Sequence, residues 1–321
     1  MDSYIKYVSA YLPSNTLTNE DITKEFPEWN GDKIFSKIGV KNRFIVKDDE
    51  TVVDMAVNVV LNMVAETNLN LSTIDYLILC TQSPDFKLPT SACIIQDRLG
   101  LSKSCAAIDI NQGCSGYIYG LSLADALVSS GNYKNVLLIT AETYSKYIHK
   151  RDKANISLFG DAATATLIST EGVYRLGKFD LGTDGNGWEN LILKNGGSRH
   201  VDDKDPDNLA NFLHMNGGEI FDFTVKNIPD LVDRNLKNNE INQQDISLFV
   251  FHQANAFMLS FLRKRIGIPA EKFLVNMENY GNTVSSSIPL AFKDFLSANH
   301  KRIMFVGFGV GYSWGAVTLF K

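Results

Sequence analysis

Short apolar runs alternate with longer amphipathic stretches along most of this chain. In the first half, the pattern predicts strands at 76–80, 105–110 and 135–141, separated by helices at 90–99 and 115–128. In the second half, it predicts strands at 246–251, 272–277 and 302–308, separated by helices at 254–266 and 285–296. Both halves have the same order of elements, which we interpret as a structural duplication. Such alternation predicts an α/β fold with mainly parallel sheets covered by helices.

Two further segments have a distinct pattern. Thr51 and Asp54 have capping-box spacing, which predicts the start of an amphipathic helix. The segment 182–207 is rich in glycine and aspartate and is predicted to be an exposed excursion rather than a linker between domains.

Composition narrows the class of protein. A chain of 321 residues that is 45% hydrophobic can bury a large core, in one double-sized domain or two. A formal net charge of -5 and the lack of a basic run argue against nucleic-acid binding. We expect no signal peptide and no transmembrane helix, because no segment is long and apolar enough. Four cysteines without a C-x-x-C pair indicate neither zinc nor a disulfide framework, so a reducing cytoplasm is expected.

Cys114 is the strongest candidate for chemistry. It lies in the motif QGCSG at 112–116, where a predicted strand gives way to a predicted helix. A helix N-terminus favours the thiolate and predicts a lowered pKa. Its flanking glycines allow close approach of backbone or ligand. We expect the other three cysteines, Cys80, Cys93 and Cys105, to be buried structural thiols.

Three later segments add candidate groups. His252 follows a buried strand, and Asn282 lies in a turn between predicted elements. Taken alone, each has an ordinary structural explanation, as a histidine bonded to the backbone and as a turn or capping asparagine. The glycine-dense segment 307–316 reads as a hairpin turn, or as a source of backbone N–H groups for an oxyanion.

Together these segments resemble a known family. The motifs QGCSG at 112–116, FGDA at 159–162, HQAN at 252–255, YGNT at 280–283 and GYSWG at 311–315 stand in the order found in β-ketoacyl-acyl carrier protein synthase III, of the thiolase-like superfamily. The resemblance covers nearly the whole chain. It implies a thiolase-like fold of two pseudo-symmetric α/β halves, 1–172 and 173–321, in a five-layered α-β-α-β-α arrangement.

The same resemblance implies a mechanism. Cys114 would accept an acyl group from a thioester, and His252 and Asn282 would bind a malonyl thioester and stabilise the enolate formed when CO2 leaves. The N–H of Cys114 and the turn at Gly309 and Val310 would form an oxyanion hole. Acyl-CoA or acyl carrier protein would be the substrates, without a cofactor, and the protein would be a cytoplasmic homodimer.

Two more positions follow from the resemblance. Phe159 would pack beside the substrate tunnel, and Asp161 would bond to the backbone near the site. Leu88 would reach the acyl pocket of the partner subunit, where a larger aromatic residue is common in the family, and would leave room for a longer acyl chain.

The chain departs from the family pattern where coenzyme A and the carrier protein bind. Lys33 stands where a tryptophan commonly stacks on adenine, Trp29 lies nearby but out of register, and Lys37 and Lys153 replace arginines. On the basic docking surface for the carrier protein, Lys264 keeps one charge. Asp222 and Phe257 occupy two other positions of that surface. We read these departures as the mark of a specialised paralogue.

Several alternatives remain at this stage. An acyltransferase on the same scaffold would pass the acyl group to oxygen or nitrogen without condensation. A scaffold partner of a synthase would lack the nucleophile, whereas Cys114 is present. A thiolase needs a second late cysteine, and a papain-like hydrolase has its cysteine near the N-terminus and a different fold. Plant-type polyketide synthases share the Cys–His–Asn set but are longer.

Overall fold

Ten strands form one continuous hydrogen-bonded sheet in the computed structural model, which describes residues 1–199 and 208–321. Outward from its middle, the first half contains β1 (Tyr4–Tyr11), β7 (Ala162–Ser169), β6 (Asn135–Glu142), β4 (Tyr76–Cys80) and β5 (Ala106–Ile110). The second half contains β8 (Tyr174–Thr183), β14 (Ser313–Phe320), β13 (Arg302–Gly309), β11 (Leu248–Phe251) and β12 (Phe273–Leu274). When these five strands of each half are counted in chain order, both halves run first, fifth, fourth, second and third from the middle outward. This repeated order confirms the duplication.

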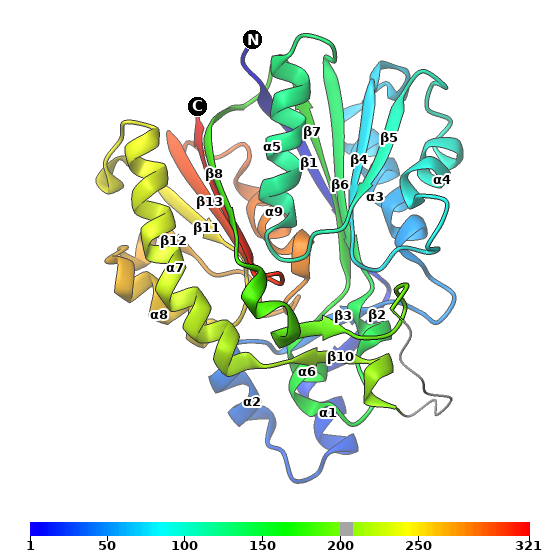
Figure 1. Cartoon of the computed structure of the whole chain (residues 1–321), viewed down its shortest axis with the longest axis vertical. Helices are drawn as coiled ribbons and strands as arrows, with labels where there is room; N and C mark the ends of the chain where they lie inside the picture. Colours follow the sequence, from blue (N-terminus) through cyan, green and yellow to red (C-terminus); the bar gives the residue numbers. More distant parts are fainter. Residues whose placement is uncertain (200–207) are drawn as a thin grey trace.

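The helices form three layers around these strands (Figure 1). The outer helices α3 (Val52–Thr67) and α4 (Ser91–Arg98) pack on the first half. The outer helices α7 (Gly217–Asn238) and α8 (Ala256–Ile266) pack on the second half. Between the halves lie α5 (Gly116–Ser129) and α9 (Ser287–Phe292), and each of them contacts strands of both. The predicted five-layered arrangement is confirmed.

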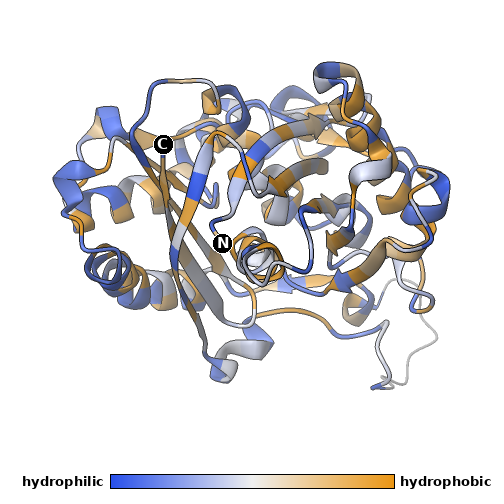
Figure 2. Cartoon of the chain, turned by 90° about the horizontal axis from the view of Figure 1, so that it is seen from above, coloured by the Kyte–Doolittle hydropathy of each residue, from blue (hydrophilic) through white to orange (hydrophobic). Residues whose placement is uncertain are grey.

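The central layer explains why α5 is apolar on more than one side. Tyr117, Ile118 and Leu121 of α5 share one buried cluster with Phe292 of α9 and Phe305 of β13. A helix with sheets on two sides has no face for solvent, so its apolar residues are not confined to one stripe. Figure 2 shows the complementary pattern, with hydrophilic residues gathered on the outward faces of peripheral helices and loops.

A smaller set of elements gathers at one end of the sheets, in the lower part of Figure 1. Arg43, which is fully buried, donates to the carbonyl of Ser157 at 2.6 Å and so ties two of these elements together. The set comprises β2 (Asn15–Thr18), β3 (Asn42–Ile45), α1 (Asn19–Glu25), α2 (Gly31–Ile38), α6 (Lys153–Leu158), β9 (Leu191–Leu193) and β10 (Leu213–Met215).

Eight short 3₁₀ helices complete the described part of the chain. They are η1 (Leu71–Thr73), η2 (Tyr144–Tyr147), η3 (Gly185–Asn190), η4 (Leu209–Asn211), η5 (Gln243–Asp245), η6 (Ala270–Lys272), η7 (Val284–Ser286) and η8 (Lys293–Phe295).

Two predicted elements are shorter than expected. The strand at 272–277 is limited to β12, because the side chain of Gln253 accepts from the N–H of Asn276 and donates to the carbonyl of Leu274 in place of a strand ladder. The helix at 285–296 is α-helical only in α9 and is 3₁₀ on both sides. Val284, with φ 54°, lies in the left-handed region and prevents an earlier α-helical start.

The described part of the glycine-rich segment predicted at 182–207 is only partly exposed. Residues 200–207 lie outside the described residues. In the described part, Leu191 begins β9 and is buried, so the prediction of a wholly exposed excursion is wrong. The proposed boundary after residue 172 falls in the turn between β7 and β8, and the division into two domains stays a prediction. Among the helices of 1–199 and 208–321, none has the length and apolar character needed to cross a membrane.

Candidate active site

Cys114 lies in the loop between β5 and α5, two residues before the helix begins. It is 6% exposed and forms part of the wall of an internal cavity. Gly309, at the end of β13, packs directly against it. A Cβ atom at Gly309 would lie 2.7 Å from the Cβ of Cys114 and 3.0 Å from its sulfur. A side chain at this position would therefore displace the thiol, so the close approach requires glycine.

His252 follows directly after β11 and is almost completely buried. Its Nδ1 lies 2.7 Å from the hydroxyl of Ser287, the first residue of α9, and its ring meets the edge of Phe308. Burial lowers the pKa of His252 to about 3, although a hydrogen bond to the backbone of Val284 opposes that shift. The imidazole is therefore neutral at pH 7.

Asn282 is held by main-chain bonds between two loops. Its N–H donates to the carbonyl of Leu158 at 2.9 Å, and its carbonyl accepts from the N–H of Gly160 at 3.1 Å. Its side-chain nitrogen lies 3.5 Å from Nε2 of His252 and 3.4 Å from the carbonyl of Ala254. The FGDA segment therefore positions the asparagine, a role that the sequence did not reveal.

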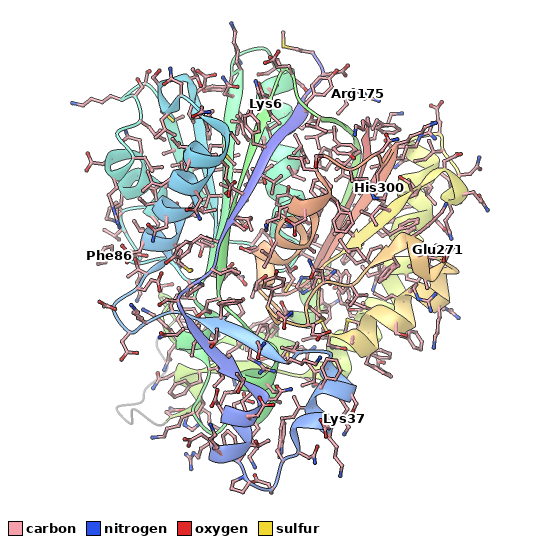
Figure 3. All side chains as sticks on the ribbon, turned by 180° about the vertical axis from the view of Figure 1, so that it is seen from behind. Lys6, Lys37, Phe86, Arg175, Glu271 and His300 are labelled. Carbon is pink, nitrogen blue, oxygen red and sulfur yellow. The ribbon has the colours of Figure 1, made fainter. Side chains whose placement is uncertain are left out.

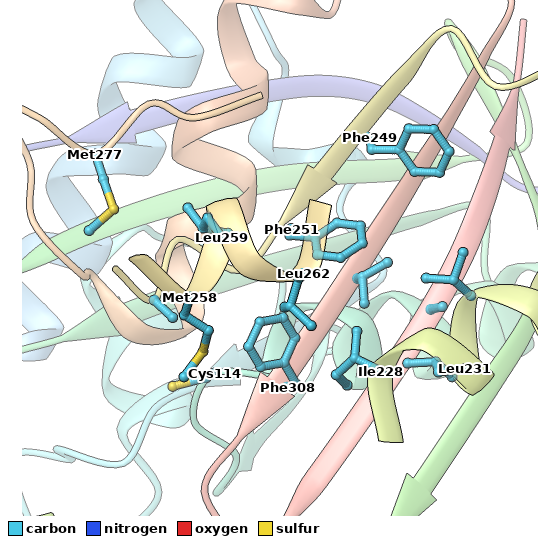
Figure 4. Close-up of a cluster of buried hydrophobic side chains, with 14 of the residues drawn as sticks. Cys114, Ile228, Leu231, Phe249, Phe251, Met258, Leu259, Leu262, Met277 and Phe308 are labelled. Atoms are coloured by element: carbon cyan, nitrogen blue, oxygen red, sulfur yellow. The ribbon is translucent and has the colours of Figure 1, made fainter. Parts of the chain in front are cut away.

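One cavity of about 70 Å³ brings these three side chains together, since Cys114, His252 and Asn282 all line it. The structure thus unites residues that are 138 and 30 positions apart in the chain (252 − 114 and 282 − 252). Figure 4 shows Cys114 beside Met258 of α8 and close to Phe308. The remaining lining residues are mostly apolar and include Leu158, Phe159, Leu191, Met215, Ile220 and Ala254.

A larger groove opens next to this cavity. It has a volume of about 790 Å³ and shares Leu158, Met215 and Asn255 with the inner cavity. Trp29 and Lys37 line it near α2, and Lys37 is visible at the lower end of the molecule in Figure 3. A long, thin ligand that enters the groove can therefore extend toward the thiol.

Two backbone N–H groups act on the thiol of Cys114. Those of Val310 and of Cys114 itself lower the pKa of the thiol. Both are the donors that the sequence resemblance implied for an oxyanion hole. Backbone N–H groups that act on a sulfur can also bind an oxygen on a carbon bonded to that sulfur.

The predicted low pKa of Cys114 is wrong for this structure. Burial raises the pKa of Cys114 to about 12, and the nearby carboxyl of Glu142 contributes to the rise. Desolvation of the charged form outweighs the helix N-terminus and the two N–H donors. The periodicity of the sequence located the helix start but not the depth at which the thiol is buried.

The burial of several other candidate residues differs from what the sequence predicted. Cys80 and Cys105 are buried, as expected, but Cys93 is exposed on α4, so its prediction as a buried thiol is wrong. Helix α4 lies on the outer surface, and an apolar helical pattern does not show which turn faces solvent.

Leu88 is 82% exposed and does not line the cavity of this single chain. Lys153 pairs with Glu28 and lies over the ring of Phe26.

Sequence reasoning missed two buried residues near the site, Ser287 and Glu142. The hydroxyl of Ser287 contacts His252, and Glu142 ends β6 fully buried beside the loop of Cys114. A signal existed for Glu142, because it is a carboxylate at the end of a continuous apolar run. The signal for Ser287 was weak, since serine is common at the start of helices.

Known proteins of one family match this chain along nearly its whole length. The family described as 3-oxoacyl-[acyl-carrier-protein] synthase III matches residues 108–185, and that of its C-terminal part matches residues 236–320. The β-ketoacyl-[acyl-carrier-protein] synthase III of Clostridium perfringens is 37% identical over 315 residues, which cover 96% of each protein.

Solved structures agree with this similarity. A 3-oxoacyl-(acyl-carrier-protein) synthase III is 42% identical, with a TM-score of 0.96 and full coverage of both chains. The 3-oxoacyl-(acyl-carrier protein) synthase of Burkholderia xenovorans LB400 is 36% identical, with a TM-score of 0.93 over 100% of this chain and 94% of that one.

Proposed function

This chain belongs to the β-ketoacyl-acyl carrier protein synthase III family and is a condensing acyltransferase with a thiolase-like fold, and from this premise we propose which residues carry each step. Cys114 is the acyl acceptor, and His252 and Asn282 act on the second thioester. The single observation that carries the proposal is that these three residues line one cavity beside two backbone donors.

The first step transfers an acyl group to Cys114. The sulfur attacks the thioester carbonyl, the oxyanion is bound by the N–H groups of Cys114 and Val310, and the thiol of the donor leaves. The proton of Cys114 ends on the departing thiolate. A thiolate of ordinary basicity, pKa about 8.5, is a stronger base than the neutral ring of His252, whose pKa is about 3.

The second step forms a carbon–carbon bond. The malonyl thioester loses CO2, and its enolate oxygen accepts hydrogen bonds from His252 and Asn282. The enolate carbon attacks the acyl carbonyl on Cys114, and the thiolate of Cys114 leaves to give a 3-oxoacyl thioester. Neutral donors suit this step, because they stabilise the enolate without a carboxylate that would repel the substrate. The neutral state of the buried His252 supports this assignment.

The groove provides a path for the carrier of the acyl group. We propose that a pantetheine arm occupies it, because it is mostly apolar and shares lining residues with the cavity of Cys114. Trp29 and Lys37 at its outer part would face a nucleotide or a carrier protein. The aromatic ring of Trp29 is thus available although it is out of register in the sequence, whereas Lys33 does not line the groove.

The acyl pocket and the oligomer form the next part of the proposal. Leu88 and Phe86 are exposed large apolar side chains on one loop, and Phe86 projects from the edge of the molecule in Figure 3. A homodimer would cover this loop and bring Leu88 of one subunit to the cavity of the other. Leucine rather than a larger aromatic residue would leave room for acyl groups longer than acetyl. Phe159 lines the cavity of Cys114, from which such a pocket would begin.

The surface beside the groove supports a specialised role. Phe257 is 63% exposed at the rim and stacks on Phe221, in a region where the family has basic residues for carrier docking. Lys264, in the last turn of α8, keeps one positive charge. We propose that carrier docking uses apolar contacts here and that the protein is a specialised paralogue rather than the general initiating synthase.

Condensation is distinguished from simple acyl transfer by its products. The protein is incubated with an acyl thioester and malonyl thioester labelled in the free carboxyl, and released CO2 is counted against 3-oxoacyl product. Equal amounts of both are expected, and no 3-oxoacyl product is expected from Cys114→Ala. Acyl transfer to an oxygen or nitrogen nucleophile without CO2 would establish the alternative function. Cys93→Ser is the matched control, because it removes an exposed thiol away from the cavity.

A further inference from the structure

A buried pair of serine hydroxyls, which the steps above do not use, lies where the turn between β13 and β14 meets the loop of Cys114. Ser313 begins β14 and is 2% exposed, and Ser115 directly follows Cys114 and has no exposed surface. Their side-chain oxygens lie 2.6 Å apart. The two residues are 198 positions apart in the chain, so this bond joins the two halves of the molecule beside the candidate nucleophile.

Ser115 departs from the usual role of a serine at the start of a helix. It is the N-cap of α5, a position where a serine hydroxyl ordinarily accepts a hydrogen bond from a backbone N–H of the first turn. Its side chain makes no such bond and instead faces Ser313. The hydroxyl therefore serves a contact between two segments rather than the stability of its own helix.

Ser313 extends this contact to the backbone of the turn. Its hydroxyl oxygen lies 2.7 Å from the carbonyl of Val310, whereas the side-chain oxygen of Gln112 is farther away, at 3.3 Å. A hydroxyl has a single proton to donate. The nearer acceptor takes this proton, so Ser313 donates to the carbonyl of Val310, and Ser115 donates to the oxygen of Ser313.

The backbone of the turn has few restraints of its own. Val310 stands between Gly309 and Gly311, which have no side chain to restrict the backbone on either side. Gly309 lines the cavity together with Cys114, and the next residue, Val310, supplies one of the two N–H groups that act on the thiol. A rotation of this glycine-flanked backbone would turn that N–H away from the sulfur.

We propose that Ser313 is a positioning residue whose hydroxyl, held by Ser115, fixes Val310 so that both N–H groups of the oxyanion hole bind one oxygen. This inference rests on the proposed roles of Cys114 and Val310 in acyl transfer. Ser313 does not line the cavity, so it acts through Val310 rather than on the substrate. The oxyanion forms only during the reaction. Loss of the hydroxyl should therefore lower the acylation rate at saturation and leave the half-saturating thioester concentration almost unchanged.

The test compares two reactions of the same sulfur in a Cys93→Ser background, which removes the exposed thiol. Acylation is measured in a single turnover with the acyl-CoA, from acetyl to octanoyl, that reacts fastest with the parent protein. In alkylation by iodoacetamide, the sulfur attacks a saturated carbon, and no oxyanion forms. A change in the ionisation of Cys114 alters both rates alike, so the ratio of acylation to alkylation isolates the stabilisation of the oxyanion.

The three serine variants should differ in this ratio. Ser313→Ala should lower it by about 10- to 100-fold, because a displaced donor costs up to about 10²-fold in rate. Ser115→Ala leaves the bond between Ser313 and Val310 in place and should lower the ratio by about twofold to tenfold. Ser313→Thr keeps the hydroxyl on a strand residue and should restore a ratio close to that of the parent protein.

Thr318→Val is the matched control for the loss of a buried hydroxyl. Thr318 lies on the same strand, is fully buried and donates to the side-chain oxygen of Asn235 at 2.8 Å. Neither residue lines the cavity. The control variant should lose stability in urea and keep the ratio of the parent protein.

A ratio equal to that of the parent protein in Ser313→Ala would overturn the inference, and so would an equal fall in Thr318→Val or Ser313→Thr. If Ser313→Ala does not fold, an unchanged ratio in Ser115→Ala would overturn it instead. Failure of the proposed function gives a different result, because no acyl-CoA would then add to Cys114 of the parent protein.

Discussion

At the scale of single residues, the site depends on neutral groups in an apolar setting. Burial keeps His252 neutral and Cys114 protonated, and two backbone N–H groups lower the pKa of the thiol. Donors that are fixed before the reaction stabilise developing charge without reorganisation. The sequence identified all three candidate side chains, because their motifs are specific. It did not predict their protonation, which depends on tertiary burial.

Substitution of the two residues proposed to bind the enolate should separate the two steps. His252→Ala and Asn282→Ala are each expected to keep acylation of Cys114 and to lower the condensation rate by about 10²–10³-fold, because each removes one donor. Single-turnover assays with acyl donor alone and with malonyl thioester added measure the two steps. Loss of acylation to the same extent as condensation in both variants would contradict these assignments.

The pH dependence of condensation follows from the neutral His252. Its pKa of about 3 lies well below that of an exposed histidine, so the ring binds no proton as pH falls from 7 to 5. Protein acylated beforehand and mixed with malonyl thioester should therefore condense at the same rate at pH 5, 6 and 7. A fall in rate with a midpoint near 6.5 would show that the imidazole is charged under these conditions.

At the scale of elements, periodicity predicted the main helices and strands, but not every boundary. Strand β4 and helix α5 agree with their predictions within one or two residues, because an apolar run or face dictates each. Strand β12 is shorter because the side chain of Gln253 bonds to the backbone that would otherwise pair with a neighbouring strand. A contact between residues more than 20 positions apart cannot be predicted from the local pattern of apolar residues. The elements at the end of the sheets, such as β9 and β10, are short and carry little periodicity.

The capping box of α3 provides a prediction at this scale. Thr51 accepts from the N–H of Asp54, and Asp54 accepts from the N–H of Thr51, as the sequence predicted. Thr51→Ala should lower the free energy of unfolding in urea by about 0.5–2 kcal/mol and leave activity unchanged. Thr67→Ala is the control, because this hydroxyl only bonds to the carbonyl of Met63 within the same helix. Equal stability of both variants would show that the cap contributes nothing.

At the scale of the whole molecule, the repeated halves explain where the site lies. Each half supplies a loop that follows one of its parallel strands, with Cys114 after β5 and His252 after β11. Ligand sites of α/β proteins collect at such strand ends. The duplication could be predicted from the order of elements. The continuity of the groove with the cavity could not, because it depends on Leu158 of α6, Met215 of β10 and Asn255 before α8.

The proposed dimer gives a prediction for the intact protein. Light scattering should give twice the mass of one chain, and Leu88→Asp should weaken the dimer at least about tenfold, because about 1.5–3 kcal/mol of apolar burial is lost. The same variant should slow the reaction of longer acyl thioesters more than that of acetyl thioester. A monomeric parent protein, or an unchanged dimer with unchanged chain-length preference, would contradict the proposed position of Leu88.

The most direct test of the account is the mass of the intact protein after incubation with a series of acyl thioesters. One acyl group per chain is expected to add, located on Cys114 by peptide mapping, and this addition should persist in Asn282→Ala and be absent in Cys114→Ala. An acyl group that still adds to Cys114→Ala, or no addition to the parent protein with any thioester, would contradict the central claim.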